Sequence, residues 1–194
     1  MDKSTRIVII DESPVRLAIL EDGLHEAGHD AIVRLSGTDR ILERVVQAEP
    51  DIIIIGLDDP GRDVLEQMFQ VSRAVPRPVA MFVDQSDSVS IEAAIDAGVS
   101  AYVVDGLRKE RVKPILETCV SRYRAFSRLR DELERTRERL DDRKVIDRAK
   151  GLLMHHRNLS EADAYALLRK TAMNEKLKLS DVARALIAAA DLLQ

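Results

Sequence analysis

The sequence predicts an α/β protein: a doubly wound five-stranded parallel sheet, followed by a long coiled-coil helix and a small three-helix bundle. Three observations support this prediction. Short β-branched runs alternate with helical stretches up to about residue 118, one uninterrupted helical pattern crosses the middle, and shorter apolar stripes fill the end. Aromatic residues make up only 3% and tryptophan is absent, which favours aliphatic packing of helices on a sheet.

The strands and helices of the first part have recognisable start and stop signals. Ser13 is a good N-cap and Pro14 suits the first helical position, so a helix is expected from there until Gly28 ends it. The run 52–55 is apolar on both faces, as in a central parallel strand. The expected strands are 6–10, 31–35, 51–55, 78–83 and 101–104, and the expected helices are 14–27, 38–48, 62–74, 88–97 and one from about residue 109.

The middle of the chain carries a heptad pattern. From residue 112 the apolar positions step by four and three, and no glycine or proline after Pro114 interrupts them until Gly151. Arg130 and Arg137 at core-type positions loosen the second half, so the first half is expected to hold a homodimer. The alternative is one amphipathic helix packed on its own domain. The predicted dimer seam comprises Val112, Leu116, Cys119, Tyr123, Phe126, Leu133 and Leu140.

Three apolar stripes predict the helices of the terminal bundle. The first covers 144–157, Ser160 with Asp163 forms a capping-box-like start of the second, and Ser180 is expected to cap the third. The predicted domains are therefore a first domain over 1–118, a coiled-coil linker helix over 119–142 and the bundle over 143–194.

Charge is distributed unevenly along the chain. Residues 1–120 hold 13 Lys/Arg against 22 Asp/Glu, a net charge of −9, whereas residues 121–194 hold 17 against 12, a net charge of +5. A polyanion is therefore expected to bind the C-terminal part. The single cysteine excludes an internal disulfide framework, and no run of about 18 apolar residues appears, so a cytoplasmic protein is expected.

Acidic residues follow the predicted strands, at the edge of a parallel sheet where ligands gather. The pair Asp11 and Glu12, Pro60–Gly61 after the third strand and the segment AIDAGVSAYVV together resemble the receiver domain of response regulators over residues 5–118. That resemblance implies an aspartate as phosphoacceptor after the third strand, a Ser or Thr after the fourth and a Lys after the fifth. This chain has Gly56, Val83 and Asp105 there.

These departures predict a vestigial acidic pocket that takes no phosphate. Gly56 stands at a degenerate phosphoacceptor position, and Asp105 would repel the developing charge that a lysine should stabilise. Asp58 and Asp59 are expected to point away from the acidic pair. Asp11 and Glu12 are interpreted as a solvated remnant, with loose binding of a hard cation as the alternative. The first domain is then expected to be a protein-binding and dimerising module that a partner protein regulates.

A second resemblance covers the end of the chain. The segments VIDRAKGLLM, LSEADAYALLRKTAM and LSDVARALI resemble the ANTAR RNA-binding module of transcription antiterminators, the AmiR, NasR and EutV group. With the receiver-like front, the whole chain resembles NasT-like antiterminators. The resemblance implies a homodimer that binds paired hairpins in leader RNA upstream of nitrate or nitrite assimilation operons. It also implies a NasS-like nitrate-sensing protein as the controlling partner.

The residues of the module suit RNA. Basic side chains neutralise phosphates, Gly151 lets a backbone approach closely, and Tyr165 and Arg169 lie one turn apart for stacking on unpaired bases. The predicted RNA-binding residues are Lys144, Arg148, Lys150, Gly151, Arg157, Tyr165, Arg169, Lys170 and Met173.

Two other functions compete with RNA binding. Residues 160–187 superficially resemble a helix-turn-helix of a DNA-binding response regulator, although Arg184 is the only base-reading cation on its last helix. A coiled-coil scaffold without nucleic acid is the third hypothesis. We expect no enzymatic activity, cofactor or metal site, because no nucleophile–base pair or metal-ligating cluster appears; His155 and His156 are interpreted as helix-end residues.

Overall fold

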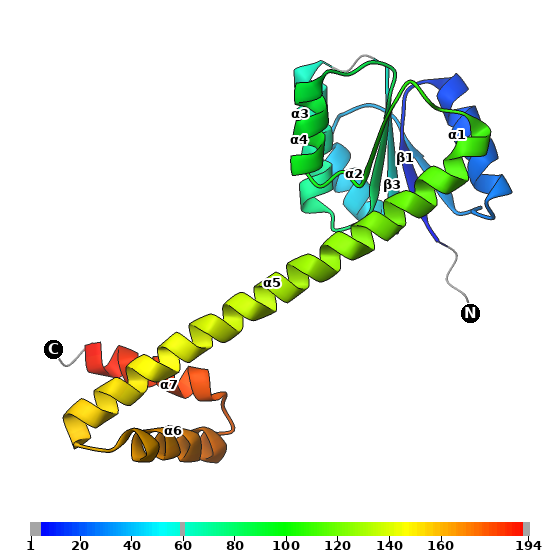
Figure 1. Ribbon diagram of the computed structural model, residues 1–194. Coiled ribbons are helices and arrows are strands. Elements are labelled where there is room, and N and C mark those ends of the chain that lie inside the picture. The colour runs from blue at the N-terminus through cyan, green and yellow to red at the C-terminus, as the bar shows by residue number, and fades with distance from the viewer. Residues whose placement is uncertain (1–4, 59–60, 192–194) are drawn as a thin grey trace. The chain divides into compact units, whose positions relative to one another are not determined.

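The computed structural model describes residues 5–58 and 61–191 (Figure 1). Asp59, which was expected to point away from the acidic pair, and Pro60 of the receiver-like Pro60–Gly61 pair lie outside the described residues. The strands are β1 (Ile7–Ile10), β2 (Ile32–Leu35), β3 (Ile52–Leu57), β4 (Val79–Val83) and β5 (Ala101–Val104). The helices are α1 (Pro14–Glu26), α2 (Ile41–Ala48), α3 (Arg62–Ala74), α4 (Ser88–Asp96), α5 (Lys109–Arg157), α6 (Glu161–Glu175) and α7 (Leu179–Asp191).

The five strands form one parallel sheet in the order β2-β1-β3-β4-β5. Ile7 of β1 is in register with Ile32 of β2 and Ile52 of β3, so these strands start together, and β3 continues two residues beyond the end of β1. The carboxyl ends of β1, β3 and β4 consequently meet at one edge. The predicted doubly wound α/β fold is confirmed.

The sheet separates two hydrophobic layers, because alternate residues of a strand face opposite sides. Ile53 and Ile55 pack with α2, α3 and α4 on one face, whereas Ile54 packs with α1 and α5 on the other (Figure 1). All three isoleucines are fully buried. This double coverage explains why the central strand reads as a continuous apolar run.

The first turns of α5 complete the core of the first domain. Val112, Leu116 and Cys119 are 1%, 4% and 0% exposed and pack with α1 and the sheet. Burial also raises the pKa of the Cys119 thiol to about 12, as befits an unreactive core residue. The prediction that these three residues hold a dimer seam is therefore wrong; this part of the helix packs on its own domain.

The chain divides into two compact units, Met1–Ser127 and Arg128–Gln194, and the division falls inside α5. The helix continues without a break through the predicted linker 119–142 and ends at Arg157. None of the described helices is long and apolar enough to cross a membrane.

The second unit is built on a small apolar core between the end of α5, α6 and α7. Its fully or nearly buried members are Ala149, Leu153, Ala164, Leu168 and Ala183. The end of α5 and the two short helices α6 and α7 around this core agree with the predicted bundle.

The caps of the bundle helices agree with the sequence in one case and not in the other. Ser160 caps α6 as predicted: its hydroxyl accepts a hydrogen bond from the Asp163 amide at 3.2 Å and donates to the Asp163 carboxylate at 2.6 Å. Ser180 does not cap α7. The helix begins one residue earlier, at Leu179, and Ser180 is buried inside its first turn.

Candidate functional site

The first candidate site is the strand-end pocket, which comprises Asp11, Arg16, Gly56, Asp58 and Asp84. Its geometry starts at the cap of α1. Ser13 accepts a hydrogen bond from the Arg16 amide at 3.4 Å, and the Ser13 amide donates to Asp11 Oδ1 at 2.8 Å. This turn places Arg16 in the first turn of α1, beside the end of β1.

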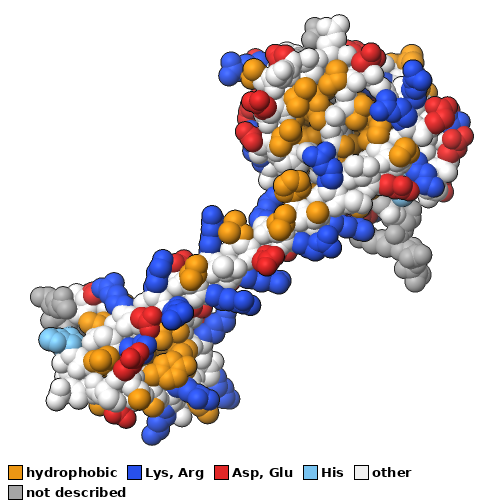
Figure 2. All heavy atoms as spheres, viewed as in Figure 1, with side chains coloured by type: hydrophobic (Ala, Val, Ile, Leu, Met, Phe, Trp, Pro, Cys, Tyr) orange, Lys and Arg blue, Asp and Glu red, His pale blue; other side chains and the backbone are white. Residues whose placement is uncertain are grey.

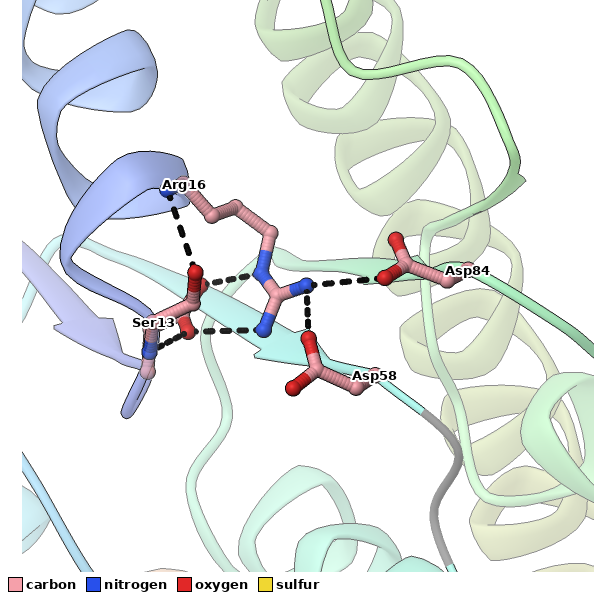
Figure 3. Close-up of polar contacts among 5 residues, drawn as sticks. Ser13, Arg16, Asp58 and Asp84 are labelled. Atoms are coloured by element: carbon pink, nitrogen blue, oxygen red, sulfur yellow. Dashed lines mark hydrogen bonds and ion pairs between the residues drawn. The ribbon is translucent and has the colours of Figure 1, made fainter.

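The Arg16 guanidinium lies among the carboxylates of the strand-end pocket (Figure 3). Its Nε donates to Asp11 Oδ2 at 2.6 Å and its Nη2 donates to Asp11 Oδ1 at 2.9 Å. Arg16 is 7% exposed and Asp11 is 2% exposed. A bidentate pair in this geometry is among the strongest side-chain contacts, and breaking a buried pair by removing one partner is costly.

The same guanidinium reaches two further carboxylates. Nη1 donates to Asp58 Oδ1 at 2.6 Å and lies 3.4 Å from Asp84 Oδ2 (Figure 3). Burial alone would lower the pKa of Arg16, but the hydrogen bonds to Asp11 and Asp58 outweigh it and raise the pKa above its usual value. The prediction that Asp58 points away from the acidic pair is wrong, because its carboxylate, although 72% exposed, contacts the same guanidinium that binds Asp11.

Gly56 leaves the space that this arrangement needs. A Cβ at position 56 would lie 1.9 Å from Asp11 Oδ2 and 2.7 Å from Arg16 Nε. The position is thus not only without a nucleophile but also closed to any side chain while Arg16 holds Asp11. Val83 is buried in the core, and Asp105 is exposed at the end of β5.

A hard cation does not fit this pocket. Both oxygens of Asp11 already accept hydrogen bonds from Arg16, and Glu12 is exposed beside them. Among residues 5–58 and 61–191, no group of three His, Cys, Asp or Glu side chains converges so as to hold a metal ion. The interpretation of Asp11 as a solvated remnant is also wrong, since it is buried and paired.

Sequence reasoning missed Arg16. One signal was available: an arginine three residues after a Ser-Pro helix start and five residues after Asp11 lies within reach of the same strand end. The acidic residues that follow the strands also need a cation close to them, and Asp105 stands at the position where the receiver resemblance implies a lysine.

The second candidate site is the α6 face, which comprises the exposed residues Tyr165, Arg169, Lys170 and Met173. Tyr165, Arg169 and Met173 are spaced four residues apart, and Tyr165 and Met173 are 44% and 70% exposed. The adjacent row of the helix, one residue earlier at each turn, packs into the bundle through Ala164, Leu168 and Ala172. Packing in the bundle core therefore does not explain which residue types stand on the exposed α6 face.

Lys150 lies beside this face but is not a free cation. Its ammonium is 2.7 Å from both Asp147 and Glu161, and only 15% of its side chain is exposed. Hydrogen bonds to Asp147 and then to Glu161 raise the pKa of Lys150, while Lys150 in turn lowers the pKa of Asp147. Glu161 lies one turn before Tyr165, so Lys150 ties α5 to the start of the α6 face. Its predicted role as an exposed phosphate contact does not match this geometry.

The other predicted residues lie in different surroundings. Lys144 and Arg148 line a groove against α7, where Arg148 donates to Asp191 at 3.0 Å. Arg157 is exposed at the end of α5, and Lys and Arg side chains follow this helix (Figure 2). Lys150 thus pairs with the first turn of α6, the helix that bears Tyr165 and Arg169, whereas Lys144 and Arg148 lie against α7.

Gly151 has open space around it. No atom outside the backbone of its own helix lies within 4 Å of a Cβ placed there. A glycine inside a helix costs roughly 0.5–1 kcal/mol relative to alanine. Packing within the bundle therefore gives no reason for this glycine.

Comparison with known proteins bears on both sites. Residues 134–187 match the family model of the ANTAR domain. The chain is also similar to the Transcriptional regulatory protein PdtaR of Mycobacterium tuberculosis, strain H37Rv, with 28% identity over 181 residues that cover 93% of this chain and 88% of that protein.

Solved structures resemble the first unit. One is the signal receiver domain of a modulated diguanylate cyclase from Desulfovibrio desulfuricans, with a TM-score of 0.54 and 14% identity, covering 63% of this chain and 98% of that one. Another is a response regulator from Thermotoga maritima, with a TM-score of 0.52 and 17% identity, covering 60% and 98%. At these identities the likeness shows a receiver-like fold.

The pocket geometry predicts the effect of a methyl group at position 56. Gly56→Ala should destabilise the first unit by about 1–3 kcal/mol, because the new Cβ collides with the Asp11 carboxylate that Arg16 holds in place. Urea unfolding of the full chain measures the loss. In an Arg16→Ala background Asp11 is free to move, so the same substitution should cost less. Equal costs in both backgrounds would contradict the geometry.

Proposed function

Because residues 134–187 form an ANTAR domain behind a receiver-like fold, we propose that this regulator is an RNA-binding transcription antiterminator. It acts on paired hairpins in leader RNA, upstream of nitrate or nitrite assimilation operons. A NasS-like nitrate-sensing partner protein, and not phosphorylation, controls it.

The α6 face is the observation that carries this proposal. An exposed ring, a guanidinium and an exposed thioether, spaced four residues apart, suit the stacking of unpaired bases. Gly151, next to Lys150, gives a phosphodiester backbone room to approach. Neither feature is required by the small core of the bundle.

DNA binding through α7 is less well supported. The one base-reading cation expected there, Arg184, donates to Asp142 at 2.6 Å and to Asp181 at 3.1 Å, so those carboxylates compete with a base edge. A gel shift with paired-hairpin leader RNA and a duplex DNA competitor separates the two functions. Preference for the duplex would replace our proposal, and indifference to both would favour a scaffold.

Substitutions on the α6 face should weaken RNA binding selectively. Arg169→Ala and Tyr165→Ala should each weaken it by roughly tenfold, because each removes one stacking partner, whereas Tyr165→Phe keeps the ring and should bind nearly as the parent does. Arg184→Ala is the matched control, since it removes the same charge from α7. Dissociation constants from a filter-binding titration at fixed salt give the comparison. Parent-like binding by both alanine variants would remove the α6 face from the site.

Control without phosphorylation is supported by the geometry at position 56, because Arg16 and Asp11 occupy the space of a phosphoacceptor side chain. The chain should therefore take no phosphoryl group from a small-molecule donor such as acetyl phosphate with MgCl2. Intact-mass spectrometry of the treated protein is the measurement, with a receiver domain that keeps its aspartate as the positive control. A stable phosphoryl adduct on residues 1–118 would refute phosphate-independent control.

We also propose that the exposed part of α5 pairs with a second copy, although Arg130 and Arg137 interrupt its apolar positions, because the first half of the predicted seam is buried in its own domain. Phe126, Leu133 and Leu140 recur every seven residues and are 63%, 51% and 55% exposed. Exposed apolar side chains at heptad spacing are the pattern of a coiled-coil seam. Tyr123, partly buried, stands at the start of this segment.

Breaking this seam should separate the copies. Leu133→Glu places a charge at the middle of the seam and should yield monomers of 21.7 kDa, whereas Arg135→Glu, two residues away on another side of the helix, should remain dimeric. Sedimentation equilibrium measures the mass. A monomeric parent, or a dimer that survives Leu133→Glu, would rule the seam out.

A further inference from the structure

We propose that the Arg16 guanidinium is the resident cation of the strand-end pocket and takes the place that a divalent metal ion would need. The receiver-like unit is accordingly independent of Mg²⁺, and removing Arg16 creates a site that binds it. This inference rests on the pocket alone and does not require that the chain bind RNA.

The Arg16 guanidinium connects the ends of three strands. Asp11 follows β1, Asp58 follows β3 and Asp84 follows β4, and Arg16 contacts a carboxylate oxygen of each at 2.6, 2.6 and 3.4 Å. Oxygen ligands from adjoining strand ends are what a hard cation uses. Here a protein side chain makes those contacts.

Arg16 and a metal ion would compete for the carboxylate oxygens of Asp11. A metal ion in this pocket would need Asp11, the one carboxylate of the three that is buried. Both of its oxygens accept hydrogen bonds from Arg16, and Oδ1 also accepts one from the Ser13 amide. Mg²⁺ would therefore have to displace a charged group that is held bidentately and is 7% exposed.

Without Arg16, this end of the sheet would carry only negative side chains close to Asp11. Asp11, Glu12, Asp58 and Asp84 surround this end of the sheet, and Asp105 stands where a receiver has its lysine. Loss of Arg16 leaves a buried carboxylate without its counter-ion and several acids close to it, which is unfavourable unless a cation enters. Arg16 thus makes this acidic edge stable in one fixed arrangement.

Calorimetry of the full chain with and without millimolar MgCl2 tests the proposal. The melting temperature of the parent should not respond to MgCl2. Arg16→Ala should lower the melting temperature of the first unit by at least about 5 °C, and MgCl2 should restore part of this loss. Arg73→Ala is the matched control, because Arg73 pairs with Glu66 at 2.7 Å on an exposed surface, and its shift should stay within about 2 °C.

A second measurement uses the parent alone, in case Arg16→Ala does not fold. Mn²⁺ broadens the NMR signals of nearby amides, so we expect the Ser13 and Gly56 amides of the parent to stay sharp during a Mn²⁺ titration. Arg16→Lys, which keeps the charge but loses the bidentate geometry, should broaden at lower Mn²⁺ concentrations than the parent. Strong broadening in the parent, or an Arg16→Ala variant that is as stable as the parent and insensitive to MgCl2, would overturn the proposal.

Discussion

The ion pair between Arg16 and Asp11 is the interaction on which the strand-end edge of this protein depends. It buries two opposite charges and satisfies them with two parallel hydrogen bonds at 2.6 and 2.9 Å. It also requires that position 56 have no side chain. A side chain at position 56 and the Arg16–Asp11 pair in this position therefore exclude each other.

Helix α5 contributes to both cores of the chain. Near its start, Val112 and Leu116 close the core of the receiver-like unit, and near its end Ala149 and Leu153 form the centre of the bundle. The part between has exposed leucines at heptad spacing, which is why we assign pairing between copies to Phe126, Leu133 and Leu140. One continuous helix therefore serves two cores and, in our proposal, the contact between two chains.

The sequence predicted the elements well because strand and helix periods, caps and turn residues are local properties. Ser13 and Ser160 cap the helices that they were expected to cap, and β5 spans the residues expected. The pocket was not predictable in the same way, since Arg16 reaches residues 42 and 68 positions away along the chain. Heptad spacing also does not distinguish apolar residues that pack on their own domain from those that stay exposed. Cys119 packs against its own sheet, whereas Leu133 is exposed. Likewise, the charge of Lys150 is evident in the sequence, but its engagement by Glu161 is not.

The claim that Arg16 is the cation of the strand-end pocket is tested most directly by the NMR signal of its side-chain Nε–H group, which donates to Asp11. Our account predicts that this proton exchanges slowly with water at neutral pH, because it is buried and donates to Asp11, and that its chemical shift does not change when MgCl2 is added. The Nε–H of the exposed Arg73 provides the reference for fast exchange. An Arg16 proton that exchanges as fast as that of Arg73, or whose shift follows the Mg²⁺ concentration, would contradict the account.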